Sequence, residues 1–216
     1  MVSPIIVLCG HSSGSTAIAG VMHHLGVDMG ASHFLPPSQD KSQGYYEDAR
    51  FVSLNRAILR QAGGAWNKLV LPKSIMAVQD QFAGPIEALL QWRQGESEGK
   101  EWGWKDPQMV QTMPLYAPFL DNPRFVVVPR DNYCAAQSLA SRKHDQMHID
   151  DALPFIRGHN LRMMALIGGL RRSVPVHYIH YDDLIDDTAT EVYKLAMFLE
   201  MFDSAISFVD PDLRHY

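Results

Sequence analysis

Cysteine is almost absent from this sequence. Two of the 216 residues are cysteine, Cys9 and Cys134, and they do not form a CxxC pair. So few thiols exclude a disulfide-stabilised scaffold and most cysteine-ligated zinc sites. The histidines at 23, 24, 177 and 180 also lack nearby ligand partners in the sequence, so we expect no metal site. Low cysteine content is typical of a reducing compartment, and we expect a cytoplasmic protein.

Long apolar runs and a surplus of positive charge are also missing. No stretch approaches the ~18 apolar residues that a membrane-spanning helix needs. The run Ile5–Cys9 is too short for a signal peptide, and Met1–Pro4 contains no basic residue. With 24 acidic and 19 basic residues, the net charge of -5 excludes broad affinity for nucleic acid or anionic membranes. We therefore expect no membrane span and no nucleic-acid partner, and any bound anion must occupy a local pocket.

The remaining composition is that of a folded domain, with 46% hydrophobic and 20% charged residues. Its length suffices for one core, and we predict a single domain over 1–216. Apolar runs predict strands at 5–9, 102–104, 125–128 and 176–181. Helical spacing predicts helices near 18–25, 51–59, 75–92, 107–119, 133–142, 155–170 and 192–199. Strands that alternate with helices indicate an α/β fold, a three-layer sandwich around a central parallel sheet of about four to five strands.

A loop rich in glycine and serine follows the first strand. It begins Gly10-His11-Ser12-Ser13-Gly14, and Ser15 and Thr16 then enter a helix. The glycines allow a tight turn, while amides and hydroxyls gather at the N-terminus of the helix, where the dipole favours an anion. A serine-rich helix cap without a ligand would have the same sequence.

Two stricter motifs compete for this loop. The phosphate-binding pattern of ordinary NTPases needs a different spacing and a lysine where Ser15 stands, which argues against such an enzyme. The Gly-x-Ser-x-Gly pattern of serine hydrolases is met, with Ser12 as nucleophile and Asp182 or Asp183 and His215 as partners. The hydrolase motif normally follows several strands, and one strand precedes this loop.

Charged residues mark the ends of the other strands. Arg130 follows the strand at 125–128, at the edge where parallel sheets bind ligands, and Ser138 and Arg142 follow one turn apart on the next predicted helix. An arginine fork suits phosphate, although a surface ion pair would also explain Arg130. Lys105 ends another strand. Glu47 and Asp48 precede a helix, where acidic residues act as N-terminal caps.

Together these motifs resemble the sulfotransferase family, whose enzymes use 3'-phosphoadenosine 5'-phosphosulfate, and the likeness is greatest to its bacterial branch. The resemblance spans nearly the whole chain, and the ordered set is more specific than any one motif. It rests on Cys9–Gly20, Gly26–Gly30, Gly44–Asp48, Trp104–Pro107, the series Arg130, Ser138 and Arg142, and Tyr181–Leu184.

The resemblance implies a P-loop-like nucleotide-binding fold and a role for each matching residue. The first loop, chiefly Ser13, Gly14, Ser15 and Thr16, would bind the 5'-phosphosulfate. Arg130 and Ser138, with Arg142 nearby, would bind the 3'-phosphate. Glu47 would deprotonate an acceptor hydroxyl or amine, and Lys105 would meet the transferring group, in a metal-free in-line transfer.

One position departs from the family pattern. The family loop carries Lys or Arg where this sequence has Ser12. Loss of that cation would lower the rate by roughly 10²–10³ unless His11, Lys41 or Lys105 replaces it. The chain is thus a sulfotransferase, a non-catalytic nucleotide-binding relative or, more remotely, a serine hydrolase. The sequence is compatible with a small-molecule or carbohydrate acceptor, and it does not specify the oligomeric state.

Overall fold

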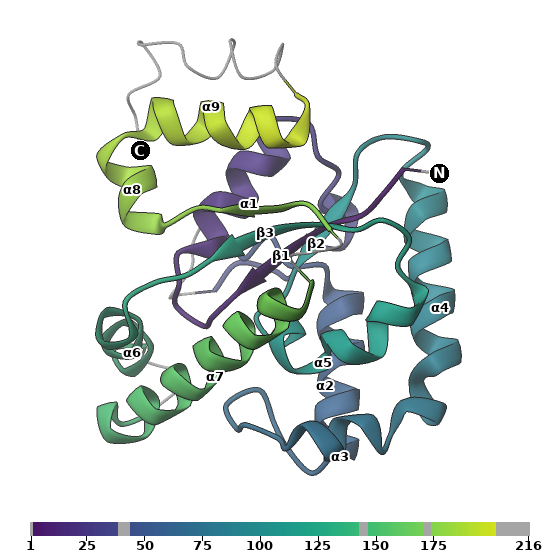
Figure 1. Cartoon of the computed structure of the whole chain (residues 1–216), viewed down its shortest axis with the longest axis vertical. Helices are drawn as coiled ribbons and strands as arrows, with labels where there is room; N and C mark the ends of the chain where they lie inside the picture. The colour runs from purple at the N-terminus through teal and green to yellow at the C-terminus, as the bar shows by residue number, and fades with distance from the viewer. Residues whose placement is uncertain (1, 39–43, 143–146, 171–173, 202–216) are drawn as a thin grey trace.

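A four-stranded parallel sheet forms the centre of the molecule (Figure 1). The computed structural model describes residues 2–38, 44–142, 147–170 and 174–201. The strand order is β2-β1-β3-β4. The strands are β1 (Ile5–Cys9), β2 (Gly103–Lys105), β3 (Arg124–Val128) and β4 (Val176–Tyr178). The prediction of a parallel sheet of about four to five strands is confirmed.

Helices cover both faces of the sheet, because successive side chains of β1 point to opposite sides. Ile6 and Leu8 pack in one core with α2 (Ala49–Gln61), α4 (Gln79–Glu96), α5 (Met109–Tyr116) and α7 (Ile149–Leu170). Ile5, Val7 and Cys9 pack in a second core with α1 (Ser15–His24), α8 (Tyr181–Asp186) and α9 (Thr188–Leu199). All five residues of β1 are buried, as expected for a strand enclosed on both faces. This arrangement is the predicted three-layer sandwich.

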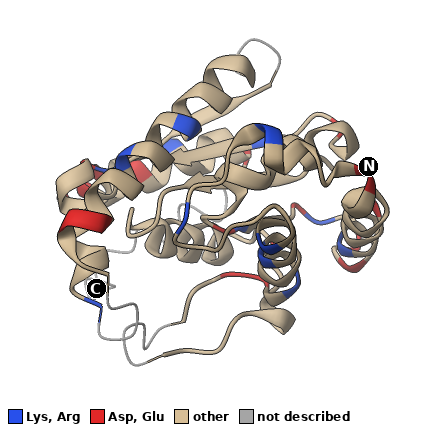
Figure 2. Ribbon diagram, turned by 90° about the horizontal axis from the view of Figure 1, so that it is seen from below, with Lys and Arg blue, Asp and Glu red and all other residues tan. Residues whose placement is uncertain are grey.

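A third apolar cluster joins α6 (Asn132–Ala140) to α7. Ala135, Ala136 and Leu139 of α6 pack there against Ala152 and Ile156 of α7. The short elements are α3 (Pro72–Met76) and the 3-10 turns η1 (Ala31–His33) and η2 (Ala117–Phe119). Lys, Arg, Asp and Glu positions of both signs are spread over the helices (Figure 2). Among the described residues, no helix combines the length and apolar composition needed to cross a lipid bilayer.

Several predicted elements are wrong in extent, and two of them differ in kind as well. The helix expected over 75–92 is two helices, because the backbone turns at Val78 between α3 and α4. Ile75 and Val78 are both buried, so the apolar spacing continues across the turn and hides it. The strand expected over 176–181 ends at Tyr178, and Tyr181-Asp182-Asp183 begins α8, where the acidic side chains favour a helix N-terminus.

The connections between the strands create a crevice at the carboxyl edge of the sheet. From β1 the chain reaches β2 on one side, and β3 then pairs with the other side of β1. Ligands bind at such switch points, outside the carboxyl ends of the strands. The loop after β1 and the residues after β3 therefore meet at this edge, on the left of Figure 1.

Candidate functional site

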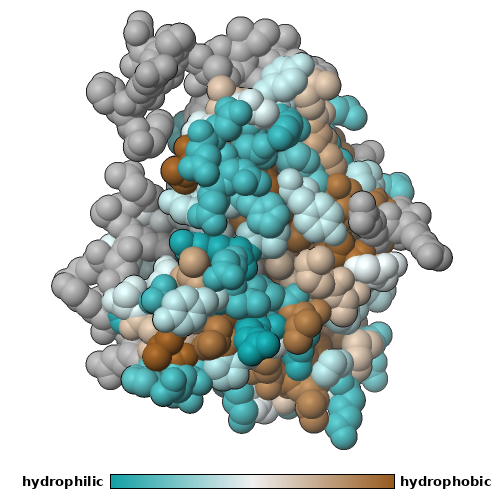
Figure 3. Space-filling view, turned by 60° about the vertical axis from the view of Figure 1, so that its left-hand side comes forward, coloured by the Kyte–Doolittle hydropathy of each residue, from teal (hydrophilic) through white to brown (hydrophobic). Residues whose placement is uncertain are grey.

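A cavity of about 980 Å³ opens at the carboxyl edge of the sheet. Figure 3 shows hydrophilic residues gathered across the middle of the face that includes this edge. The cavity brings together most of the residues proposed from the sequence for binding or catalysis, and these are His11, Ser12, Ser13, Gly14, Ser15, Thr16, Glu47, Lys105, Arg130, Ser138 and Arg142. The sequence therefore identified groups that share one cavity, although they come from five separate segments.

The first loop is shaped by Gly14, which precedes α1 with a φ of 83°. A Cβ at this position would lie 2.3 Å from the ring of Tyr181, so only glycine fits against that ring. Gly14 offers no side chain to the first turn of α1, and Ser13 and Ser15 are buried beside it. The loop thus presents the N-terminus of a helix to the cavity, as expected for an anion site.

Two arginines converge on Ser12 from different elements. Arg130 follows β3, and its Nη1 donates a hydrogen bond of 2.7 Å to the Ser12 carbonyl oxygen. Arg142 lies beyond the end of α6, and its Nη2 donates a hydrogen bond of 2.7 Å to Ser12 Oγ. The expectation that Ser138 and Arg142 share one helix is wrong, because α6 ends at Ala140. Ser138 lines the cavity from α6.

Glu47 and Lys105 form a close ion pair in the cavity wall. Lys105, the last residue of β2, places its Nζ 2.5 Å from Glu47 Oε1 and 3.4 Å from Thr16 Oγ1. Both side chains are buried, and the ammonium links the carboxylate to the first turn of α1. The interpretation of Glu47 as a helix cap is wrong, because Asp48 alone caps α2 by accepting a hydrogen bond from the Arg50 amide.

Asp106 lies beside this ion pair and is fully buried. The pKa of Asp106 is raised from 3.8 to about 6. The main cause is burial, and the second is the nearby Glu47 carboxylate. Asn55 Nδ2 donates to Asp106 Oδ2 at 2.8 Å, and the Gln108 amide donates to Oδ1 at 2.9 Å. A carboxyl group with such a pKa can change protonation near neutral pH, so the charge of the cavity wall depends on pH.

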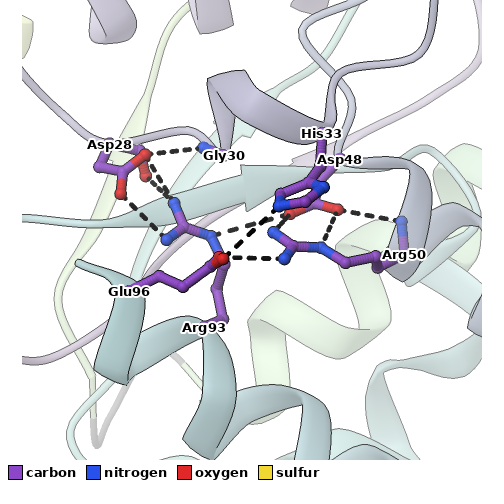
Figure 4. A network of polar contacts seen from close by, with 7 residues as sticks. All are labelled: Asp28, Gly30, His33, Asp48, Arg50, Arg93 and Glu96. Atoms are coloured by element: carbon purple, nitrogen blue, oxygen red, sulfur yellow. Dashed lines mark hydrogen bonds and ion pairs between the residues drawn. The ribbon is translucent and has the colours of Figure 1, made fainter.

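Asp48 belongs to a polar network behind the cavity wall (Figure 4). Arg93 of α4 is almost completely buried, binds both carboxylate oxygens of Asp28 and places its Nε 3.7 Å from Asp48 Oδ2. Arg50 pairs with Asp48 and, at 3.0 Å, with Glu96. Burial raises the pKa of Asp28, but the hydrogen bonds from Arg93 and Gly30 outweigh it and lower the pKa. The network ties the segment before Glu47 to α4.

His11 faces a cluster of rings at another part of the wall. Its imidazole lies 5.4 Å from the ring of Trp66, 5.5 Å from that of Phe155 and 5.4 Å from that of His159. The pKa of His159 is lowered to about 4, mainly because the ring is buried and secondly because the positive charge of Arg162 is near. These contacts give His11 a packing role in addition to its place in the cavity lining.

The fold is similar to that of solved sulfotransferases. The sulfotransferase domain from the curacin biosynthetic pathway matches with a TM-score of 0.56 and 12% identity, over 93% of this chain and 74% of that one. The sulfotransferase domain from the Synechococcus olefin synthase matches with a TM-score of 0.54 and 16% identity, over 100% of this chain and 84% of that one. A sulfotransferase from Mycobacterium avium matches with a TM-score of 0.59 and 14% identity, over 100% of this chain and 69% of that one. This chain has a sulfotransferase fold.

The sulfotransferase fold is P-loop-like, as predicted. No protein-family model and no curated protein sequence matches the chain, so the likeness lies in structure. At identities of 12–16%, the likeness shows the architecture alone. Within the described residues, no group of three or more His, Cys, Asp or Glu side chains is placed to hold a metal ion.

In this sulfotransferase fold the Gly-x-Ser-x-Gly loop does not show a hydrolase geometry. Ser12 Oγ accepts a hydrogen bond from the guanidinium of Arg142, whereas a nucleophilic serine needs a general base that accepts its proton. Asp182 and Asp183 lie on α8, and His215 lies outside the described residues.

Among the cavity residues that were missed in the sequence are Tyr181, Trp66, Gln108 and Arg56. Tyr181 packs against Gly14 and lies under the Arg130 guanidinium, 5.4 Å from its ring centroid. Tyr181 belongs to the motif at 181–184, which could have indicated a role in the site. The sequence analysis instead assigned it to the end of the strand predicted over 176–181. Trp66 and Gln108 also line the cavity, and no pattern in the sequence singled them out.

Proposed function

We propose that this protein is a sulfotransferase that moves a sulfuryl group from 3'-phosphoadenosine 5'-phosphosulfate to an acceptor hydroxyl or amine. One observation carries the proposal: on a sulfotransferase fold, the Glu47–Lys105 pair and two arginines share a cavity with the first loop. The positive groups at 105, 130 and 142 suit a ligand with several phosphates.

The donor would lie across the crevice between β1 and β3. Ser13, Gly14, Ser15 and Thr16 would bind its 5'-phosphosulfate through hydroxyls and helix-terminal amides. Arg130 and Ser138, from the neighbouring segments, would bind the 3'-phosphate. The similarity of the fold to solved sulfotransferases supports this donor class. The acceptor would be a small molecule or a carbohydrate.

Glu47 would act as the general base of the transfer. Its carboxylate accepts the acceptor proton while the acceptor oxygen or nitrogen forms a bond to sulfur. The bond between sulfur and the 5'-phosphate oxygen breaks at the same time, and the phosphate departs with the electron pair and the negative charge. Lys105, 2.5 Å from Glu47, can move from the carboxylate to the transferring group once the proton is taken. We propose that no metal takes part and that the protein works in the cytoplasm.

A second candidate function is nucleotide binding without catalysis. It is favoured by the sequence of the first loop, which contains no Lys or Arg between Cys9 and Gly20. A loop of this kind would keep the phosphate contacts and lose stabilisation of the departing group.

A turnover assay separates the two candidates. The protein is incubated with the donor and a panel of small alcohols, phenols, amines and sugars, and 3',5'-phosphoadenosine and sulfated products are measured by mass spectrometry. We expect acceptor-dependent formation of both products, and a large loss with Glu47→Gln. Tight binding of 3',5'-phosphoadenosine without any product would favour the non-catalytic candidate.

A further inference from the structure

We propose that Arg142 provides the positive charge of the first loop and contacts the phosphate that departs during transfer. The inference rests on the proposed function and adds a catalytic role that the sequence did not indicate, since the groups considered there were His11, Lys41 and Lys105. Lys41 lies outside the described residues.

The contact between Ser12 and Arg142 spans 130 positions of the chain. Ser12 has a φ of 58°, a left-handed conformation that is uncommon for residues other than glycine. Its hydroxyl accepts the 2.7 Å hydrogen bond from Arg142 Nη2 and so holds the guanidinium directly beside the loop. Both side chains line the cavity, so the charge lies where a bound phosphate can reach it.

Besides Arg142, the described part of the cavity wall contains the basic residues Arg56, His11, Lys105 and Arg130, and the last three are engaged in other contacts. Lys105 is paired with Glu47 on the acceptor side of the loop. Arg130 donates to the backbone of Ser12 rather than to its side chain, and its guanidinium also lies over the ring of Tyr181. His11 packs among aromatic rings. Arg142 is therefore the cation that the Ser12 side chain itself orients.

The chemistry of transfer needs a charge at this place. As the bond from sulfur to the phosphate oxygen breaks, negative charge develops on that oxygen. An oriented guanidinium therefore stabilises the transition state more than it stabilises the bound donor. A serine at position 12 leaves room for a cation that enters from the end of α6. Ser12 and Arg142 together thus place a positive charge beside the departing phosphate, which one lysine or arginine at position 12 could also do.

The test compares nucleotide affinity in four proteins. Calorimetry measures binding of 5'-AMP and of 3',5'-phosphoadenosine to the wild type and to the Arg142→Gln, Arg142→Lys and Arg130→Gln variants. We expect Arg142→Gln to weaken both nucleotides by a similar factor of about 10–100, because both carry the 5'-phosphate. Arg142→Lys should recover part of this loss. Arg130→Gln should weaken 3',5'-phosphoadenosine more than 5'-AMP.

A charge swap tests the position of the cation. Arg142→Gln should lower kcat by roughly 10²–10³, and adding Ser12→Arg to that variant should restore at least about tenfold. Ser12→Arg alone should lower kcat, because two guanidiniums would then compete for one place. Arg157→Gln, on the exposed surface of α7, should leave kcat and both affinities unchanged.

Three results would overturn the inference: unchanged affinities and kcat in Arg142→Gln, a selective loss of 3',5'-phosphoadenosine affinity in that variant, or no recovery in the double variant. The second result would move Arg142 to the 3'-phosphate. A wild-type protein that binds neither nucleotide would instead refute the proposed function itself.

Discussion

Lys105 Nζ lies 2.5 Å from Glu47 Oε1, and the two residues are separated by 58 positions in the chain. The ion pair holds the proposed base in the wall of the cavity and connects it to Thr16 at the start of α1. Because Lys105 ends β2, the rigid sheet fixes the position of the carboxylate. The pair is therefore both a structural element and the proposed reaction centre.

Glu47→Gln should abolish most turnover. If Glu47 takes the acceptor proton, the variant should lose a factor of roughly 10²–10⁴ in kcat, while its affinity for 3',5'-phosphoadenosine stays within about threefold. Steady-state kinetics and calorimetry measure the two quantities. Glu87→Gln, on the exposed side of α4, is the matched control. A variant with normal kcat would show that Glu47 has only a structural role.

Lys105→Met should destabilise the fold, because it leaves the Glu47 carboxylate buried without its partner. Removal of one member of a buried pair costs about 3–5 kcal/mol in the free energy of unfolding. The double variant Glu47→Gln/Lys105→Met should regain part of that loss, which urea denaturation can measure. Lys100→Met, at an exposed turn, serves as the control. Simple additivity of the two single changes would contradict a coupled pair.

Asp48→Ala should lower the stability of the fold more than Glu47→Gln does. The substitution removes the cap of α2 and takes one carboxylate from the buried Arg93, so we expect a loss of about 3–5 kcal/mol in the free energy of unfolding. Urea denaturation measures this loss, and Asp80→Ala, on the exposed part of α4, should change the midpoint of urea unfolding little. A small effect of Asp48→Ala would mean that Asp28 alone satisfies Arg93.

Asp106 should make stability depend on pH. Its pKa is raised to about 6 in the folded state, mainly by burial, so the protonated form is favoured by folding. Its contribution is fully present below the unfolded pKa and is lost as the pH rises through about 6. Relative to the wild type, Asp106→Asn should therefore gain up to about 3 kcal/mol between pH 4 and pH 7. Urea unfolding across this range checks the sign, and a difference that stays constant or falls would refute it.

Much of the architecture could be predicted because it depends on local patterns. Continuous apolar runs identified β1 and β3, and glycine and serine after β1 identified the first loop. The ends of strands also indicated Lys105 and Arg130, since parallel strands bring their carboxyl ends to one edge. These predictions use spacing and residue type alone.

The remaining features depend on tertiary contacts. The end of α6 decides whether Arg142 continues the helix or turns toward Ser12, and no residue in 138–142 marks that end. Glu47 fits a helix cap by its position, and only the approach of Lys105 from β2 shows that it is paired. The raised pKa of Asp106 comes from burial by α2 and α5, which the sequence around it does not reveal.

Binding of a 3'-phosphorylated adenosine nucleotide tests the central claim most directly. Calorimetric titration of the wild-type protein should show that 3',5'-phosphoadenosine binds about 10–100 times more tightly than 5'-AMP, since a charged hydrogen bond to the extra phosphate contributes roughly 1.5–3 kcal/mol. Arg130→Gln should remove most of that difference. Equal affinities for the two nucleotides in the wild type, or no binding of either, would contradict the assignment of this cavity to a sulfuryl donor.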